Sequence, residues 1–274
     1  MKQVKSFRLI LSLLALLCLL SGCATVVGTG RSQLNMVSDD ELNQAASLQY
    51  SQLLKGSHLS SDRQQTRMIK NVGARIAKAA ERLMAAEGRQ GEISGYKWEF
   101  NLIDSKEVNA FCMPGGKVAF YTGIMPICKD EAGVAAVMGH EVAHALARHG
   151  NERVSQQMMV GIGANLLGLG LGLGGVSSGA SDLIMTAYSV GSQFGVMLPY
   201  SRAHESEADR IGMTLMAMAG YDPHEAVALW KRMDAAGGSS PPYFMSTHPS
   251  NRQRIEGLEK YMPEAMQYYS GPKK

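Results

Sequence analysis

The sequence contains few cysteines and no run of basic residues. Its 274 residues include 4 cysteines, none of them spaced as CxxC, which argues against a metal centre built from thiolates. The formal net charge is +3, and three of the 27 basic residues are Lys2, Lys5 and Arg8. Without these three, the chain carries 24 basic and 24 acidic side chains, so its charge does not favour a nucleic-acid partner.

The first 22 residues differ from the rest of the chain. Their basic start precedes an apolar run of 12 residues, "LILSLLALLCLL" (9–20), which is too short to span a bilayer but has the length of a signal-peptide core. "LSGC" (20–23) then matches a bacterial lipobox, whose cysteine is lipidated and becomes the new N-terminus. We expect a signal peptide over 1–22 and a lipid anchor on Cys23 at the periplasmic face of the outer membrane, because Ala24 follows it. An uncleaved anchor or an ordinary secretory signal is the alternative.

Two further cysteines lie outside this N-terminal region, Cys112 and Cys128. Since an exported protein reaches a compartment that permits disulfides, the two are predicted to form one. Two free, partly buried thiols are the alternative.

The middle of the chain is organised as a folded domain over 38–270. Residues 23–37 are small and polar, with little periodicity, and are predicted to be a tether to that domain. Ser38 and Glu41 have the spacing of a capping box and predict a helix over 38–54. Further helices are predicted over 62–86, 201–219, 221–237 and after "STHPSNRQRI" (246–255).

Two segments have the pattern of strands. "YKWEFNLID" (96–104) alternates apolar and polar residues, and "KVAFYTGIM" (117–125) is rich in strand formers. They are predicted to form a small, largely antiparallel sheet, joined by a loop with a turn at Pro114. Asp130 is then predicted to cap a helix that runs to about residue 158. The fold class is therefore α+β and mainly helical.

Residues 161–198 are rich in glycine and contain a single charged residue, Asp182. Small residues of this kind occur where helices pack closely or where a loop is mobile, so we expect an insert of packed helices or a lid. A membrane-contacting hairpin is the alternative, and the glycines argue against a lone transmembrane helix.

His140, Glu141 and His144 form an HExxH motif. On a helix, residues four apart share a face, so both imidazoles point to one place and the glutamate lies beside it. This arrangement lets the histidines bind zinc while the carboxylate reaches an activated water. His149 is nine residues past His140 and is predicted on the opposite face, as a solvent-facing or capping side chain. Gly150 stands where a metzincin places its third histidine, so the third ligand comes from elsewhere.

The segment "SRAHESEADRIG" (201–212) carries the second candidate pattern. In gluzincins an ExxxD pattern supplies the third zinc ligand from its glutamate, while the aspartate accepts a hydrogen bond from a ligating histidine. Glu205 and Asp209 fit these two roles, with a solvated helix face as the alternative. Glu207 and His204 are rotated away and are weaker candidates.

HExxH followed about 60 residues later by "ESEAD" resembles metallopeptidase family forty-eight, which contains the HtpX and CAAX-prenyl proteases, and within it the exported LoiP and BepA type. The resemblance covers roughly residues 60–260. It implies a zincin-type (gluzincin) domain that binds one Zn²⁺, with a small antiparallel sheet packed on the HExxH helix. "NAFCMPGGKVAFYTGIM" (109–125) is similar to the family's segment before that helix, in which an edge strand pairs with the substrate backbone. The residues that this likeness assigns to the substrate edge are Gly115, Gly116, Lys117 and Val118.

"STHPSNRQRI" resembles a late element of the same family, and that likeness places His248 near the zinc. It implies that His248 either donates to the oxyanion or occupies the fourth coordination position and holds the enzyme inactive. A loop histidine that caps the last helix is the alternative. Arg252 and Arg254 either orient this loop or bind a carboxylate.

These patterns together predict a zinc endopeptidase in which Glu141 moves a proton from the attacking water to the leaving amine. The resemblance implies misfolded or stalled envelope proteins as substrates and outer-membrane assembly machinery as a partner. A non-proteolytic chaperone or assembly factor that uses the same cleft for binding is the alternative. A peptidoglycan hydrolase does not explain the strand placed just before the zinc helix.

Overall fold

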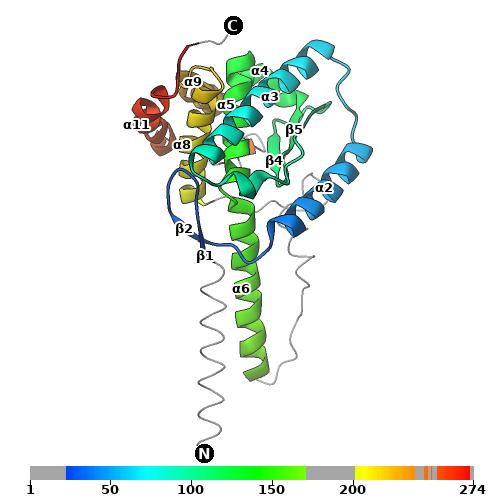
Figure 1. Ribbon diagram of the computed structural model, residues 1–274. Helices are drawn as coiled ribbons and strands as arrows, with labels where there is room; N and C mark the ends of the chain where they lie inside the picture. The colour runs from blue at the N-terminus through cyan, green and yellow to red at the C-terminus, as the bar shows by residue number, and fades with distance from the viewer. Residues whose placement is uncertain (1–22, 171–200, 238–243, 246–247, 249–251, 272–274) are drawn as a thin grey trace, which may run out of the picture.

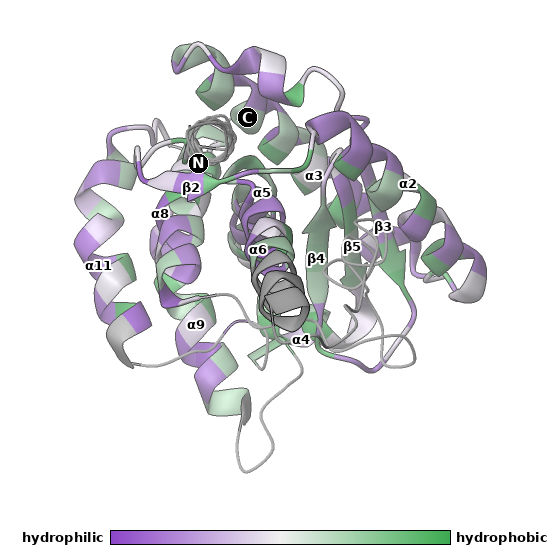
Figure 2. Ribbon diagram, turned by 90° about the horizontal axis from the view of Figure 1, so that it is seen from below, coloured by the Kyte–Doolittle hydropathy of each residue, from purple (hydrophilic) through white to green (hydrophobic). Residues whose placement is uncertain are grey.

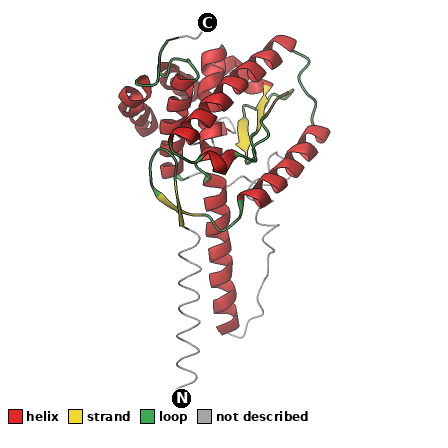
Figure 3. Ribbon diagram, viewed as in Figure 1, coloured by secondary structure: helices red, strands yellow, loops and turns green. Residues whose placement is uncertain are grey.

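The computed structural model describes residues 23–170, 201–237, 244–245, 248 and 252–271 (Figure 1). The strands are β1 (Cys23–Thr25), β2 (Ser32–Leu34), β3 (Glu99–Ile103), β4 (Ala110–Met113) and β5 (Lys117–Tyr121). The helices are α2 (Asp39–Gly56), α3 (Arg63–Ala86), α4 (Met125–Cys128), α5 (Glu131–Leu146), α6 (His149–Gly170), α8 (Arg202–Met218), α9 (His224–Gly237) and α11 (Arg252–Met266), with short 3-10 turns at Gln90–Ile93 and Thr122–Ile124. The fold is mainly helical with small sheets, which confirms the predicted class (Figure 3).

The helix starts follow from side-chain caps, of which the sequence predicts those at Ser38 and Asp130. Ser38 and Glu41 form the capping box of α2, and Asp62 accepts hydrogen bonds from the first backbone N–H groups of α3. Asp130 does the same for α5 by accepting from the N–H groups of Ala132 and Gly133. These caps satisfy donors that have no partner within the helix, so each helix begins where its cap stands.

The sheet beside α5 contains one strand more than the sequence predicts. Its order is β3-β5-β4, with β4 antiparallel to β5 and β3 parallel to β5. A small sheet is as expected, but the two predicted strands, β3 and β5, run parallel, and the antiparallel partner of β5 is β4, which lies in the predicted loop. This strand reverses the chain once more, so β3 and β5 run in the same direction.

The three-stranded sheet lies between α2 on one face and α3 with α5 on the other (Figure 2). Strand residues alternate between these faces: Val118 and Phe120 of β5 join the main core, whereas Ala119 and Tyr121 join a second apolar cluster against α2. On the far side of α5 lie α8, α9 and α11. The zinc-motif helix α5 is therefore the central element, with the sheet on one side and the later helices on the other.

α5 and α8 approach each other to backbone contact at two glycines. A Cβ added to Gly139 would lie 2.8 Å from the carbonyl oxygen of Gly212, and a Cβ added to Gly212 would lie 2.9 Å from the backbone nitrogen of His140. No other residue type leaves room for both backbones at this crossing. The contact sets the spacing between the two helices directly beside the first histidine of the motif.

The predicted continuous helix from Asp130 to about residue 158 is wrong, because it is broken after the motif. α5 ends at Leu146, and Arg148 has a φ of +58°, in the left-handed region that side chains other than glycine rarely adopt. A new helix, α6, then begins at His149. Arg148 is held there by ion pairs with Asp39 and Glu92.

Residues 23–37 are not the predicted tether, because they fold onto the body. β1 and β2 pair antiparallel, and Val26 and Val27 between them are buried in the main core. The side-chain amide of Gln33 donates a 2.9 Å hydrogen bond to the carbonyl of Ala147 at the end of α5. Two adjacent valines and a few polar contacts hold the segment, and such contacts leave no periodic pattern in the sequence.

Within the described residues, no helix is long and apolar enough to cross a membrane. The predicted signal peptide over 1–22 lies outside the described residues, as does most of the glycine-rich insert, since α6 is described only to Gly170.

The glycine contact between α5 and α8 predicts that Gly212→Ala destabilises the protein. The new methyl group meets backbone atoms that cannot move aside, so we expect the free energy of unfolding to fall by about 1–3 kcal/mol. Gly257→Ala, on α11, is the matched control, because a Cβ there meets nothing within 4 Å. Because alanine is favoured over glycine inside a helix, Gly257→Ala should instead raise the free energy of unfolding by roughly 0.5–1 kcal/mol. Urea unfolding monitored by circular dichroism measures both, and equal effects would refute a steric origin.

Candidate metal centre

The two histidines of HExxH lie on the same face of α5, as the spacing predicts. His140 and His144 are 3% and 2% exposed, and their Nε2 atoms are 3.1 Å apart. Burial holds the pKa of His144 well below its usual value, so this imidazole is neutral, which is the form that binds metals.

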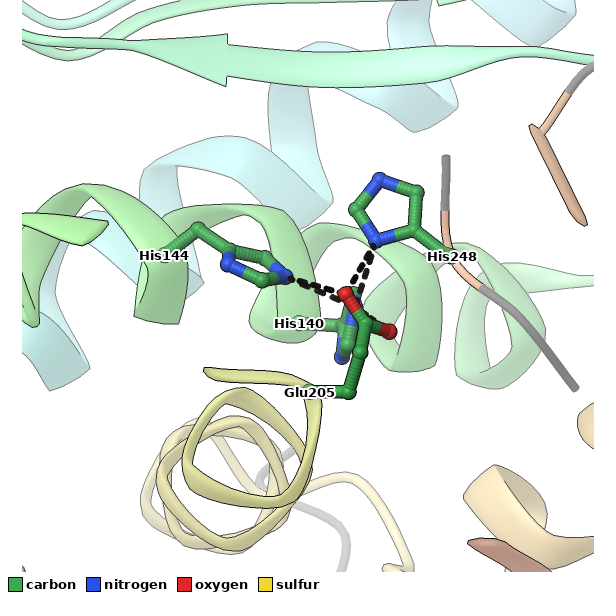
Figure 4. A group of neighbouring side chains, drawn as sticks. All are labelled: His140, His144, Glu205 and His248. Carbon is green, nitrogen blue, oxygen red and sulfur yellow. Dashed lines mark hydrogen bonds and ion pairs between the residues drawn. The ribbon is translucent and has the colours of Figure 1, made fainter. Parts of the chain in front are cut away.

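Glu205 reaches the same point from the first turn of α8 (Figure 4). Its Oε1 lies 3.4 Å from His144 Nε2, and its Oε2 lies 3.6 Å from His140 Nε2. Burial alone would raise the pKa of Glu205, but the nearby charges of His248 and Arg254 hold it well below its usual range. The carboxylate is therefore ionised, as a metal ligand must be.

His248 completes the cluster from the segment before α11. Its Nδ1 lies 3.0 Å from Glu205 Oε1 and 3.2 Å from His140 Nε2, and the side chain is 2% exposed. Phe244 positions the residue, because its carbonyl accepts from the His248 backbone N–H and its ring stacks on the imidazole. The structure thus places His248 in the ligand cluster rather than as a loop cap.

The geometry and chemistry of the cluster fit zinc. One possible ligand atom from each of His140, His144, Glu205 and His248 lies within 4.8 Å of the others, and all four residues are buried. Four ligands at zinc's usual bond lengths around a tetrahedral centre lie about 3.4 Å apart, which matches these separations. Imidazole nitrogens and a carboxylate are also zinc's usual donors, so the cluster is able to bind the ion.

Asp209 and Arg254 surround the cluster. Asp209 Oδ1 lies 2.9 Å from His140 Nδ1, where it can accept that N–H and leave Nε2 directed at the cluster. Arg254 donates two hydrogen bonds to Asp209 and one of 2.6 Å to Glu205, and its guanidinium lies 3.4 Å above the ring centre of Trp230. The sequence did not decide whether Arg252 and Arg254 orient the loop or bind a carboxylate. In the structure Arg254 binds two carboxylates, while the side chain of Arg252 lies outside the described residues.

Glu141 lies beside the cluster with an unused oxygen. Its Oε1 is buried without a hydrogen bond, 3.6 Å from His248 Nε2. Burial raises the pKa of Glu141 to about 7, against the opposing charge of His248. A carboxylate with a pKa near neutrality and a free oxygen has the properties of a general base.

The predicted solvent-facing position of His149 is wrong. The residue is fully buried, its Nδ1 lies 2.9 Å from His144 Nδ1, and its Nε2 lies 3.1 Å from Glu207. The prediction assumed a continuous helix, whereas the break at Arg148 turns His149 back towards His144. Burial lowers the pKa of His149 to about 4, so its ring is neutral at pH 7. Only the position of the break could have revealed this contact, and the residue with the positive φ is Arg148 rather than the nearby Gly150.

The predicted disulfide is not formed, because Cys112 and Cys128 are both free and buried. Cys112 lies on β4, whereas Cys128 ends α4, where its carbonyl approaches Gly133 and accepts from Arg232. Burial raises the pKa of the Cys128 thiol to about 12, and that of Cys112 is also raised, so neither is a reactive thiolate.

The predicted substrate edge is also misplaced. Gly115 and Gly116 form the turn after β4, and Lys117 and Val118 begin β5, which is the central strand with partners on both sides. The outer strand against α5 is β4, whose second edge pairs with no described strand.

Comparison with known proteins agrees with this geometry. Residues 64–262 match peptidase family M48. The chain belongs to this family. Members of family M48 use zinc, in accord with the buried cluster.

Curated relatives in family M48 include the mitochondrial metalloendopeptidase OMA1 of Schizosaccharomyces pombe, 41% identical over 192 residues, which are 69% of this chain and 53% of the relative. The OMA1 of Saccharomyces cerevisiae is 33% identical over 209 residues, 73% of this chain and 57% of the relative. The β-barrel assembly-enhancing protease of Escherichia coli is 30% identical over 216 residues, 75% of this chain and 41% of the relative. The chain spans about half the length of the curated relatives it matches.

The cluster predicts that zinc binding depends on Glu205. Glu205→Ala removes a charged donor, so zinc affinity should fall by more than the roughly 10–100-fold caused by losing an outer-shell partner. Glu81→Ala, on the exposed face of α3, is the control and should bind zinc as the wild type does. Competition with a chromophoric chelator measures both constants. Unchanged affinity in Glu205→Ala would exclude Glu205 as a ligand.

Proposed function

We propose that the protein is a zinc-dependent endopeptidase that hydrolyses misfolded or stalled proteins of the cell envelope. The observation that carries the proposal is the convergence of His140, His144 and Glu205, with the unused oxygen of Glu141 beside them. Membership of peptidase family M48 supports the same reaction class.

The chain's own residues supply proton transfer and positioning. When bound, zinc would act as a Lewis acid on the scissile carbonyl and lower the pKa of a water molecule. Glu141 accepts the proton of the attacking water at its free oxygen and delivers it to the leaving amine. The surrounding burial strengthens these charge interactions by excluding bulk water.

The substrate backbone is proposed to add to the free edge of β4, beside α5. Main-chain pairing of this kind selects extended segments with little demand on side chains, which suits an enzyme that degrades unfolded proteins. The corrected edge contains Ala110–Met113 rather than the residues of the following turn and β5.

His248 is proposed to act as a resting fourth ligand. Its Nδ1 lies among the other ligand atoms, whereas a donor reserved for the oxyanion would stand apart from them. A catalytic zinc needs one open position, so substrate has to displace this imidazole.

The proposed site of action is the periplasmic face of the outer membrane, with a lipid on Cys23 as the anchor. The lipobox supports the anchor, and the name of the Escherichia coli relative, a β-barrel assembly-enhancing protease, is in keeping with outer-membrane assembly machinery as a partner.

Two substitutions test the chemistry on an unfolded fluorescent substrate at saturating zinc. Glu141→Gln should lower kcat by about 10²–10⁴-fold, because it removes the base without changing its size. His248→Ala should raise the rate several-fold if the imidazole blocks the fourth position, whereas loss of an oxyanion donor would lower it by about 10²–10³-fold.

Glu131→Gln, at the more exposed start of α5, is the control for both variants. Hydrolysis that persists in Glu141→Gln would exclude Glu141 as the base, whereas a zinc-loaded wild type without hydrolysis would favour the alternative of a binding protein that uses the same cleft. The zinc content of each variant, measured in parallel, separates loss of metal from loss of the base.

The anchor is tested by metabolic labelling with a fatty-acid analogue in a bacterial host. Cys23→Ser should abolish the label and release the protein from the membrane fraction, because Cys23 is the lipid acceptor. Cys128→Ser, which alters a buried cysteine, should keep both. Label retained in Cys23→Ser would eliminate this anchor.

A further inference from the structure

A second buried polar cluster lies behind His144, on the side away from the ligand cluster. It consists of His149, Glu152, His204 and Glu207, all at most 8% exposed, gathered around the guanidinium of Arg31. The imidazoles of His149 and His204 stack with ring centres 4.4 Å apart. The proposed reaction uses none of these residues, although burying so many polar groups is costly unless each is paired.

Arg31 connects this cluster to the N-terminal hairpin of β1 and β2. Its Nη1 and Nη2 donate to the two oxygens of Glu152 at 2.9 and 2.7 Å, and its Nε and Nη2 donate to the two oxygens of Glu207 at 2.8 and 3.0 Å. Thr29 adds a 3.0 Å hydrogen bond to Glu207, and His204 lies 3.0 Å from Glu152. A single guanidinium thus bridges two carboxylates from α6 and α8, a geometry that lysine cannot reproduce.

The contacts form a chain with a defined direction from Arg31 to His144. Arginine has only donors, so both oxygens of Glu207 are acceptors, and Oε2 also accepts the Nε2–H of His149. With its N–H on Nε2, the ring of His149 presents Nδ1 as an acceptor, so the N–H at that contact belongs to His144 Nδ1. The lone pair of His144 is left on Nε2, which faces the ligand cluster.

The two motif histidines are therefore fixed from different parts of the chain. His140 is oriented by Asp209, on the neighbouring helix α8. His144 is oriented through His149 and Glu207 by Arg31 of the N-terminal hairpin. Arg31 lies 113 positions before His144 in the sequence.

We propose that Arg31 is a positioning residue for the metal centre. Through Glu207 and His149, Arg31 sets the tautomer and orientation of His144, so docking of the hairpin completes the zinc site. The proposal rests on the metal centre proposed above. It assigns to residues 23–34 a role in metal binding in addition to any role in anchoring.

Zinc affinity of the full chain, measured by competition with a chromophoric chelator, tests the assignment. Arg31→Gln and Glu207→Gln should each weaken zinc binding by roughly 10–100-fold, the usual effect of removing an outer-shell partner. The double variant should be no weaker than either single variant, because both changes break the same chain. Arg31→Lys keeps the charge but not the bridge and should show an intermediate loss.

Glu87→Gln is the matched control for hairpin docking. The Glu87 carboxylate accepts from the backbone N–H of Gly28, so this variant weakens another attachment of the same hairpin without touching the cluster. Its zinc affinity should equal that of the wild type. An equal loss in Glu87→Gln and Arg31→Gln would overturn the specific role of Arg31.

The visible spectrum of the cobalt-substituted protein supplies a readout that a merely structural role would not change, since it reports the ligand field. We expect the d–d bands of Arg31→Gln to shift while its circular dichroism spectrum stays that of the wild type. Wild-type zinc affinity and an unchanged cobalt spectrum in the folded Arg31→Gln variant would refute the proposal. In that case wild-type peptidase activity would still support the proposed function. Conversely, a wild type that lacks peptidase activity but whose zinc affinity depends on Arg31 would contradict the proposed function and leave the role of Arg31 intact.

Discussion

The close crossing of α5 and α8 determines what the rest of the site can do. Because Gly139 and Gly212 let the two backbones touch, the first turn of α8 carries Glu205 to the face of α5 that presents His140 and His144. Helices spaced by ordinary side chains stand about 8–10 Å apart between axes, so a bulkier contact at this crossing would move Glu205 away from the two imidazoles with which it must share one ion. The ligand set is therefore a consequence of helix packing as much as of ligand identity.

Burial strengthens the electrostatic interactions of this site, but it also costs free energy because charged groups leave water. Glu205 and Asp209 are ionisable groups taken out of water, and such charges are tolerated only when they are paired and hydrogen-bonded. Arg254 contacts both carboxylates and stacks on Trp230, so one cation compensates two anions. The remaining negative charge is available to a divalent cation. Glu141 is outside this pairing with Arg254, and burial raises its pKa to about 7.

Local patterns in the sequence were sufficient to predict the caps of α2 and α5 and the pairing of HExxH with ExxxD. The caps depend on residues within one helical turn. The metal-ligand pairing depends on two short motifs, each of which can be recognised from its own spacing. The missed features depend on tertiary contacts. β4 is too short to show an alternation, and Arg148 adopts its positive φ because Asp39 and Glu92 hold it. Once that break was missed, the helical rotation placed His149 on the wrong face.

The N-terminal segment shows how composition can mislead about architecture. A stretch of small and polar residues looks like a tether, yet Val26 and Val27 enter the core and Arg31 enters a buried ion cluster. Cys23 pairs with Leu34 as the first residue of β1, so a lipid on Cys23 would leave no flexible spacer between membrane and folded body. The same hairpin lies against α6 and reaches the residues behind His144 through Arg31. The proposed anchor and the proposed support of the metal site therefore belong to one structural element.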